Sequence, residues 1–308
     1  MTMPTDIAII DTMIGFPSTD RREVYKFLAP SLRDKESQED FKMPAQYMFK
    51  DIPADIGEGV DPVAVTLHNM DTYGVRQGMV NVGNEDREAP RRAVREFPER
   101  FLPCIDVDPR HGMDAVRRIK SFHDEWGVVA VTSFPAGALV AINDAPYYPI
   151  YAACVELDIP IFLTAGVPGP RVPLKTQKVE HLDEVCWFFP ELKVVMRHGA
   201  EPWEELAVKL MLKWPNLYYS TSALAEALSQ GDHRLRQHAR LGQDHLRRVL
   251  PGRSDLRTNH DRAAGRAAER QRVAEVPEGQ RGPGARTRLN PWECRASENS
   301  GPLRVPDP

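Results

Sequence analysis

Between Asp61 and Leu224 the sequence alternates amphipathic segments with short, continuous apolar segments at a steady interval. Amphipathic segments predict surface helices, and continuous apolar runs predict strands that are buried on both faces. Such an alternation is typical of βα units around a parallel sheet. The expected strands are Ile7–Ile10, Arg76–Val82, Phe101–Val107, Val128–Thr132, Ile161–Thr164, Lys193–Met196 and Leu217–Ser220. The expected helices are Pro62–Tyr73, Arg87–Phe97, Met113–Glu125, Ala145–Leu157, Val179–Phe188 and Trp203–Lys213.

Seven strands in this order predict an α/β fold, a (β/α)8 barrel that is truncated after its seventh strand. The expected barrel domain covers residues 1–225, with an irregular inserted segment at 15–60 that forms a lid or an oligomer contact. Because a parallel barrel has no free edge only when it is closed, a barrel without its last unit is expected to be unstable or prone to aggregation.

The composition changes at residue 225. The first 225 residues carry 24 basic against 33 acidic residues, a net charge of −9, whereas the rest carry 16 against 11, a net charge of +5. Residues 226–308 contain no Lys, Ile, Phe, Tyr or Met, and Trp292 is their one aromatic residue. A segment so poor in large apolar side chains cannot offset the entropy of ordering its backbone, so a disordered Arg-rich tail is expected.

Two origins explain such a tail: a genuine basic interaction segment, or coding DNA translated in a shifted frame. A one-base shift of a back-translation from Ala225 to Pro251 reads PKHYPKAIIDYANTRGSARTIFAGYFP, which contains a helix pattern and an apolar strand. This shifted peptide is the helix–strand unit that the barrel lacks. We therefore predict a frameshift at this point.

Composition also excludes several classes of protein. No apolar run approaches the roughly 20 residues of a membrane span, and no secretory signal precedes the first strand, so a cytoplasmic protein is expected. A net charge of −4 gives no reason to expect a nucleic-acid partner. The four cysteines lack CxxC spacing, which argues against a disulfide framework and a structural zinc site.

Polar side chains follow most of the expected strands, where barrel enzymes place their active sites. His198, which has a pKa near neutrality in an ordinary setting, is the candidate general acid or base, with Arg197 or Asp106 shaping its charge. The other interpretation is that His198 hydrogen-bonds neighbouring loops. The expected substrate pocket consists of Asp11, Asn81, Thr132, Thr164 and Ser220.

Several runs carry a family resemblance, namely FPERFLPCIDVDP, YYPIYAACVELDIPIFLTAG, FPELKVVMRHGAEPWEEL and WPNLYYSTSAL. They are similar to the second amidohydrolase group of the amidohydrolase superfamily, which includes aminocarboxymuconate-semialdehyde decarboxylase and related carboxy-lyases. The resemblance implies a TIM barrel and one divalent metal such as zinc. It places the metal-binding His pair of the first strand on Met13 and Gly15, a further His on Thr164, and another on His198.

Met13 and Thr164 supply no imidazole nitrogen, so most of this ligand pattern is broken and the residues themselves establish no metal. A substitute ligand set would consist of Asp11, Asp106, Asp108 and His198. The resemblance therefore implies a hydrolase or carboxy-lyase with a degenerate metal site that acts on a small organic acid. The alternatives are a catalytically inactive barrel used for binding or homo-oligomeric assembly, and a non-functional frameshifted product.

Overall fold

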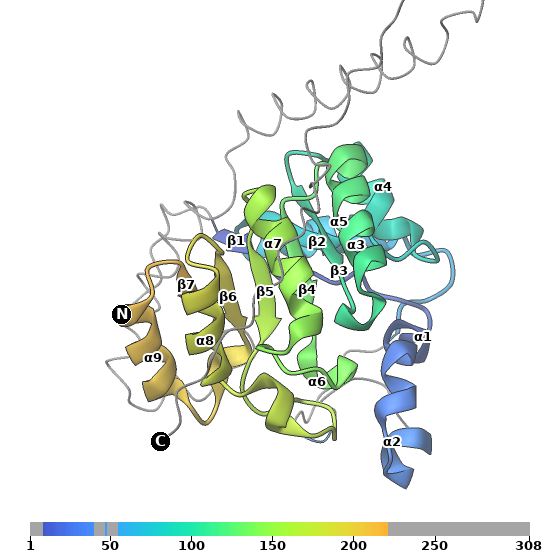
Figure 1. Cartoon of the computed structure of the whole chain (residues 1–308). Coiled ribbons are helices and arrows are strands. Elements are labelled where there is room, and N and C mark those ends of the chain that lie inside the picture. The colour runs from blue at the N-terminus through green and yellow to red at the C-terminus, as the bar shows by residue number, and fades with distance from the viewer. Residues whose placement is uncertain (1–8, 40–46, 48–54, 221–308) are drawn as a thin grey trace, which may run out of the picture. The chain divides into compact units, whose positions relative to one another are not determined.

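The computed structural model describes residues 9–39, 47 and 55–220, which all lie in one compact unit of the chain. Seven parallel strands form one curled sheet in chain order, with β1 and β7 at its edges (Figure 1). The strands are β1 (Ile9–Asp11), β2 (Val75–Asn81), β3 (Phe101–Asp106), β4 (Ala130–Ser133), β5 (Ile161–Thr164), β6 (Val194–Arg197) and β7 (Leu217–Tyr219). The predicted α/β barrel is confirmed up to its seventh strand; the expected tail lies outside the described residues.

Helices connect successive strands and cover the outer face of the sheet (Figure 1). They are α3 (Pro62–Thr72), α4 (Glu88–Glu96), α5 (Met113–Trp126), α6 (Pro135–Ala138), α7 (Tyr148–Glu156), α8 (His181–Phe188) and α9 (Glu204–Lys213). Local signals fix their ends. The Asp61 carboxylate caps α3 by accepting a hydrogen bond from the Val63 amide at 2.9 Å. Gly127, at a φ of 65°, ends α5 in the left-handed conformation that glycine adopts without strain.

Alternation along the strands sorts the core into two layers. The outward layer packs against the helices; α5, for example, buries Ala115, Val116, Ile119 and Phe122, which recur at helical spacing on one face. The inward layer fills the centre of the sheet's concave side with Met79, Leu102, Cys104, Ala130, Phe162 and Val195. The free cysteines Cys104, Cys154 and Cys186 are all buried, as expected for small apolar side chains.

The inserted segment after β1 contains short helices where the sequence predicted an irregular chain. These are α1 (Arg21–Tyr25), the 3-10 helix η1 (Lys26–Ser31) and α2 (Lys35–Glu39). Helices of five or six residues complete too few turns to show apolar periodicity, so the pattern could not reveal them. Asp20 caps α1 through the Arg22 amide at 2.9 Å.

The inserted segment lies against the loops that follow β4 and β5. Leu32 packs with Ala136 of α6 and Val172, and the Arg171 guanidinium contacts Asp34 at 2.7 Å. Hydrogen bonds from the Ser37 amide and from Arg171 lower the pKa of Asp34 to about 2. The segment therefore forms part of the wall at the C-terminal ends of the strands.

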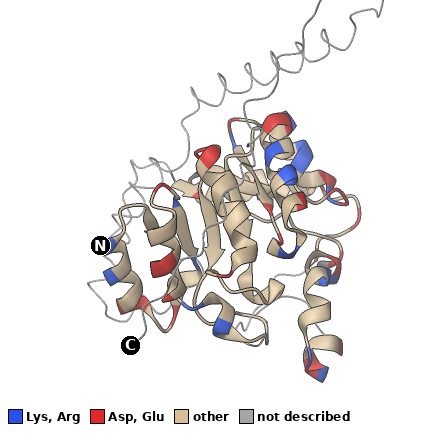
Figure 2. Ribbon diagram, in the orientation of Figure 1, with Lys and Arg blue, Asp and Glu red and all other residues tan. Residues whose placement is uncertain are grey.

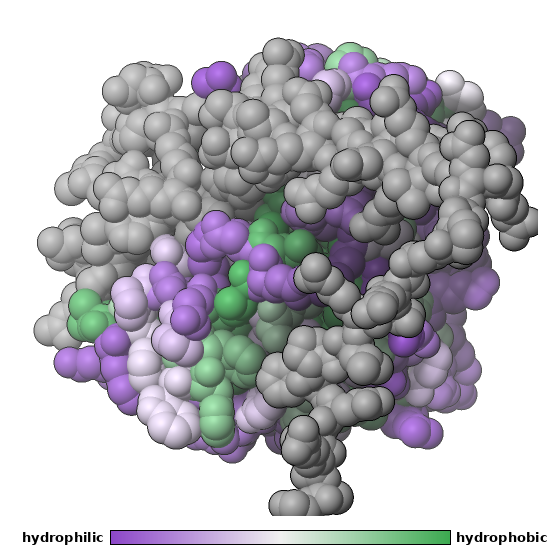
Figure 3. All heavy atoms as spheres, turned by 45° about the horizontal axis from the view of Figure 1, so that its top comes forward, coloured by the Kyte–Doolittle hydropathy of each residue, from purple (hydrophilic) through white to green (hydrophobic). Residues whose placement is uncertain are grey.

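Charged residues lie mainly on helices and loops, and the strands contain few of them (Figure 2). Figure 3 shows apolar side chains in green on one face, with hydrophilic side chains in purple beside them. Trp187, Phe188 and Leu212 are among the exposed apolar residues. None of the described helices has the length and apolar character needed to cross a lipid bilayer.

Candidate functional site

Three of the four charged residues in the described strands lie at one end of the sheet. Four charged residues occur in the seven strands: Arg76 near the start of β2, and Asp11, Asp106 and Arg197 as the last residues of β1, β3 and β6. Because parallel strands end at the same rim, these last three residues lie at the rim where barrel enzymes bind substrates. A charge at a strand end is costly to bury, so a cluster of them at this rim indicates function more than stability.

Strand register shows which polar residues face the inside of the barrel. Asp106 is paired with Thr132, Thr132 with Phe162 of the inward layer, and Thr164 with Arg197. Residues paired in register share a face of the sheet. We call the inward surface formed by Asn81, Asp106, Thr132, Thr164 and Arg197 the mouth of the barrel.

Asp106 is the acidic group of the mouth. The hydroxyl of Thr132 donates a hydrogen bond to its Oδ1 at 2.9 Å. The residue is exposed to solvent, and desolvation by the surrounding protein raises the pKa of Asp106 to about 6. The hydrogen bond from Thr132 and the charge of Arg197 lower the same pKa and so limit the rise. Asp106 can therefore take up and release a proton near neutral pH.

Arg197 is the basic group of the mouth, and the structure holds it in place from two sides. Its NH2 group donates a hydrogen bond to the carbonyl of Thr12 at 2.7 Å, and its guanidinium carbon lies 5.5 Å from the centre of the Phe162 ring. Burial lowers the pKa of Arg197, while the nearby Cys104, Asp106 and Asp11 raise it. Its Nε is buried and has no hydrogen-bond partner among the described residues.

The turn after β6 is strained. His198, Gly199 and Ala200 have φ values of 62°, 74° and 56°, in a region that residues other than glycine rarely adopt. Neighbouring strands hold it: the Gly199 amide donates to the Ser220 carbonyl at 3.2 Å, and the Tyr219 hydroxyl donates to the Gly199 carbonyl. Strain of this kind is kept at functional sites when surrounding structure enforces it.

The predicted site residues divide into three groups. Asp106, Thr132, Thr164 and Arg197 come together in the mouth, and Asn81 lies at its edge, where its Oδ1 accepts a hydrogen bond from the Gly83 amide at 2.8 Å. His198 and Ser220 follow β6 and β7 in the strained turn and beside it.

Asp11 and Asp108 form the third group, because both stabilise local turns. Asp11 is in register with Gly78, on the face of the sheet opposite Ile10, and its Oδ1 accepts a hydrogen bond from the Met13 amide at 2.8 Å. Asp108 caps a short 3-10 helix and forms an ion pair with Arg110 at 2.5 Å. Asp11 also lies close enough to Arg197 to raise the pKa of that guanidinium, so its place in the pocket stays a prediction.

The described residues do not fit a divalent metal. They contain no group of three or more His, Cys, Asp or Glu side chains arranged to hold one. Cys104, the inward cysteine nearest Asp106, is buried, and burial raises the pKa of its thiol to about 12, so it remains protonated. Zinc and manganese need several convergent deprotonated ligands, and the substitute set of Asp11, Asp108 and His198 does not provide them within the described part of the chain.

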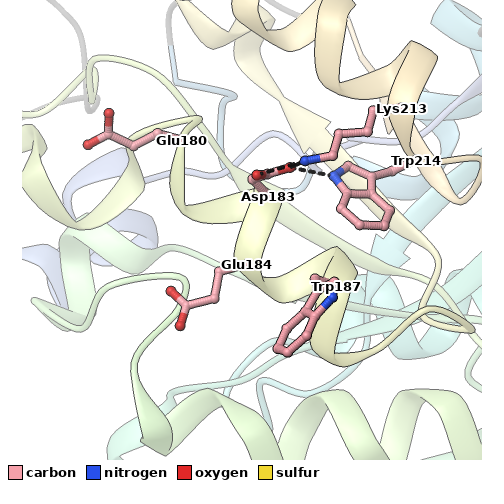
Figure 4. Close-up of a pocket in the computed structure, with 6 residues that line it drawn as sticks. All are labelled: Glu180, Asp183, Glu184, Trp187, Lys213 and Trp214. Carbon is pink, nitrogen blue, oxygen red and sulfur yellow. Dashed lines mark hydrogen bonds and ion pairs between the residues drawn. The ribbon is translucent and has the colours of Figure 1, made fainter.

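A cavity of about 390 Å³ lies elsewhere, between α8 and α9 on the helical layer. Figure 4 shows that Asp183 of α8 points toward Lys213 and Trp214, with both of which it interacts. The Lys213 ammonium lies 2.7 Å from the Asp183 carboxylate, and the Trp214 indole donates to the same carboxylate at 2.7 Å. Because Asp183 and Lys213 already pair with each other, we do not take this cavity as the candidate active site.

The sequence model of one protein family, described as Amidohydrolase, matches residues 26–255. Among solved structures, 5-carboxyvanillate decarboxylase from Novosphingobium aromaticivorans, with bound manganese, is 15% identical, with a TM-score of 0.51 over 72% of this chain and 81% of that chain. A Lactobacillus casei protein provisionally described as a metal-dependent hydrolase is 14% identical, with a TM-score of 0.51 over 76% of this chain and 78% of that chain.

An uncharacterised TIM-barrel protein from Bordetella bronchiseptica is 20% identical, with a TM-score of 0.49 over 70% of this chain and 75% of that chain. Identities this low establish a likeness of fold alone. No curated protein sequence matches the chain. The two structures with TM-scores of 0.51 agree with the barrel architecture.

Proposed function

This chain belongs to the amidohydrolase family, and from that premise we propose that it is a hydrolase or carboxy-lyase acting on a small organic acid at the mouth of the barrel. The single observation that carries the proposal is the pair of opposite charges, Asp106 and Arg197, on the inward ends of β3 and β6. A decarboxylase of the same fold, that of Novosphingobium aromaticivorans, supports the carboxy-lyase half of the proposal.

Arg197 binds the carboxylate of the substrate in this proposal. Its guanidinium is fixed by Thr12 and Phe162, so little side-chain entropy is lost when a carboxylate binds. A charge-assisted hydrogen bond from Nε would satisfy the donor that has no partner among the described residues. The remaining body of the acid would contact the apolar side chains of the inward layer.

Asp106 carries the proton. In a decarboxylation, CO2 leaves and its bonding electron pair stays on the substrate carbon, which then takes the proton of the Asp106 carboxylic acid. In a hydrolysis, the Asp106 carboxylate accepts a proton from the attacking water and delivers it to the leaving group. A carboxyl group with a pKa of about 6 populates both protonation states near neutral pH, as either step requires.

His198 is the other candidate proton carrier, as its sequence position predicted. It follows Arg197 directly and lies half-buried in the strained turn after β6. We assign the proton to Asp106 because strand register with Thr132 places it in the mouth, whereas His198 lies beyond the end of β6. Separate replacement of Asp106 and His198 distinguishes the two roles.

A degenerate metal site is part of the proposal. The positions that the family resemblance assigns to metal-binding histidines hold Met13, Gly15 and Thr164 in this chain. These losses also favour the alternative that the barrel binds a small acid without turning it over. Turnover by the full chain decides between them.

The experiment assays the full chain against a panel of small aromatic and aliphatic carboxylic acids, with product formation followed by mass spectrometry. Arg197→Gln is expected to raise KM, because the variant loses the carboxylate contact. Asp106→Asn is expected to lower kcat by roughly 10²–10⁴-fold, the usual contribution of general acid–base catalysis. A matched control, Thr72→Ser on the outer helix α3, should leave both constants unchanged. Binding without any product would favour the inactive barrel.

A further inference from the structure

We propose that the mouth of the barrel works without a divalent metal ion, and that the guanidinium of Arg197 supplies the positive charge that holds the substrate's carboxylate. The claim that the bound group is a carboxylate rests on the proposed function. The metal-binding part rests on the residues alone. The two parts are therefore tested by different measurements.

The carboxylates near the mouth are already committed to other partners. Both oxygens of Asp108 interact with the Arg110 side chain, at 2.5 to 3.0 Å. Asp11 accepts a hydrogen bond from the Met13 amide and lies on the outer face by register. Among the described strand residues, Asp106 is the carboxylate that register places in the mouth, where it accepts a hydrogen bond from Thr132. One inward carboxylate is too few for a zinc or manganese site, which needs three or more protein ligands or an equivalent set.

Arg197 occupies the interior at the level where a cation would have to sit. Its register partner on β5 is Thr164, one of the positions to which the family resemblance assigns a metal-binding histidine. The guanidinium is anchored to the Thr12 carbonyl across the barrel and lies over the Phe162 ring, so it cannot move aside without losing both contacts. A divalent ion beside this fixed positive charge would be repelled, whereas an anion would be attracted.

The chemistry of the guanidinium suits this role. Arginine stays charged at all physiological pH values and presents several donors in one plane, which matches a carboxylate. The guanidinium has five N–H donors, one of which, on NH2, hydrogen-bonds the Thr12 carbonyl. The side chain thus supplies, within the chain itself, the electrostatic attraction that a metal would otherwise provide.

The metal part is tested by electron paramagnetic resonance of Mn²⁺, whose signal from the free ion falls when the ion binds protein. Equimolar full-length chain is expected to leave the Mn²⁺ signal unchanged, or to reduce it equally in the wild type, Asp106→Asn and His198→Ala. An equal reduction would place the ion outside the mouth. Binding by the wild type that either variant abolishes would overturn the proposal.

The anion part is tested with benzoate as the probe, by ligand-observed NMR in the presence of EDTA. Wild-type chain is expected to bind benzoate under these conditions, and Arg197→Gln to weaken binding by about tenfold or more. Arg197→Lys, which keeps the charge, is expected to retain part of the affinity. Circular dichroism of both variants checks that they are folded. Benzoate binding that needs added Mn²⁺, that Arg197→Gln leaves intact, or that the wild type lacks would contradict the proposal.

The two proposals can fail separately. If benzoate binds through Arg197 without metal but no acid of the panel is converted, the proposed function fails and the metal-independent anion site stands. If an acid is converted only when Mn²⁺ is bound at the mouth, the proposed function stands and this inference fails.

Discussion

The environment of Asp106 decides how this residue can act. Desolvation raises the pKa of Asp106. The hydrogen bond from Thr132 and the charge of Arg197 lower it in part, so the carboxyl group has a pKa of about 6. The sequence could predict Asp106, Thr132, Thr164 and Arg197 as site residues because each ends or nearly ends a strand. It could not predict the contact between Arg197 and the Thr12 carbonyl, which joins residues 185 positions apart. Nor could it show that Arg197 takes the inward face, because that depends on the register of β6.

A raised pKa in the folded state makes stability depend on pH in a defined direction. The carboxyl pKa of Asp106 is 3.8 in the unfolded chain and about 6 in the folded one, so the folded state binds its proton more tightly. The favourable contribution is present below pH 3.8 and is lost as the pH rises through about 6. Asp106→Asn is therefore expected to gain stability relative to the wild type between these pH values. Urea unfolding at several pH values measures the difference; a constant difference would contradict the assignment.

The Thr132 hydroxyl is expected to tune this titration. Its hydrogen bond to Oδ1 of Asp106 lowers the carboxyl pKa, because it stabilises the charged form. Thr132→Val keeps the shape and removes the donor, so the pKa of Asp106 should rise further. Thr132→Ser keeps the hydroxyl and should preserve the wild-type value. An NMR titration of the Asp106 carboxyl carbon checks both, and equal pKa values in the Val and Ser variants would rule out this role.

At the scale of elements, the loop after β5 and the turn after β6 support each other. The Val167 amide donates to the Glu201 carbonyl at 2.7 Å, and the buried Gln177 side chain donates to the Gly166 carbonyl at 2.8 Å. Gly166 has a φ of 99°, and a Cβ atom there would lie 2.7 Å from the Glu201 carbonyl oxygen. The close approach of these two backbones keeps the strained turn beside Arg197 in place.

Replacement of Gly166 tests this support. Gly166→Ala is expected to lower the free energy of unfolding by about 1–3 kcal/mol, because the backbone there is strained for any residue with a Cβ. Gly15→Ala is the matched control, since nothing lies within 4 Å of a Cβ at that position. Chemical denaturation of the three chains gives the comparison. Equal losses in both variants would mean that the close approach does not matter.

The long elements were predictable and the short ones were not. The expected and observed bounds of the six predicted helices and of the strands differ by a few residues at most, as for Pro62–Tyr73 against Pro62–Thr72. Long segments repeat their apolar pattern several times, so tertiary contacts cannot easily override it. The helices of residues 21–39 and α6 depend on capping and on contacts with distant loops, which leave little trace in the sequence.

At the scale of the whole molecule, the described sheet has two edges, β1 and β7. Within residues 9–220, β1 pairs only with β2 and β7 only with β6, so each has one side without a described strand partner. An open parallel edge exposes backbone groups that a complete barrel would pair. The frameshift and the disordered tail concern residues outside the described part of the chain and stay predictions.

Restoring the frame tests these predictions. A chain in which the shifted peptide replaces the residues after 225 is expected to melt at least roughly 5 °C higher and to aggregate less, because a further strand would pair the open edges. A chain carrying the same peptide with its residues scrambled is the control. Differential scanning fluorimetry and light scattering measure both properties. Equal melting temperatures for the restored and scrambled chains would argue against a missing unit.

The strands follow one another across the sheet in the order in which the ribosome makes them. Each newly synthesised strand therefore meets an edge that its predecessor has just formed, and docking can proceed while synthesis continues. In such a molecule an error late in translation leaves the earlier docking steps untouched. Asp106 and Arg197, which belong to β3 and β6, both precede residue 225, so an error at that point leaves the segments that carry them unchanged.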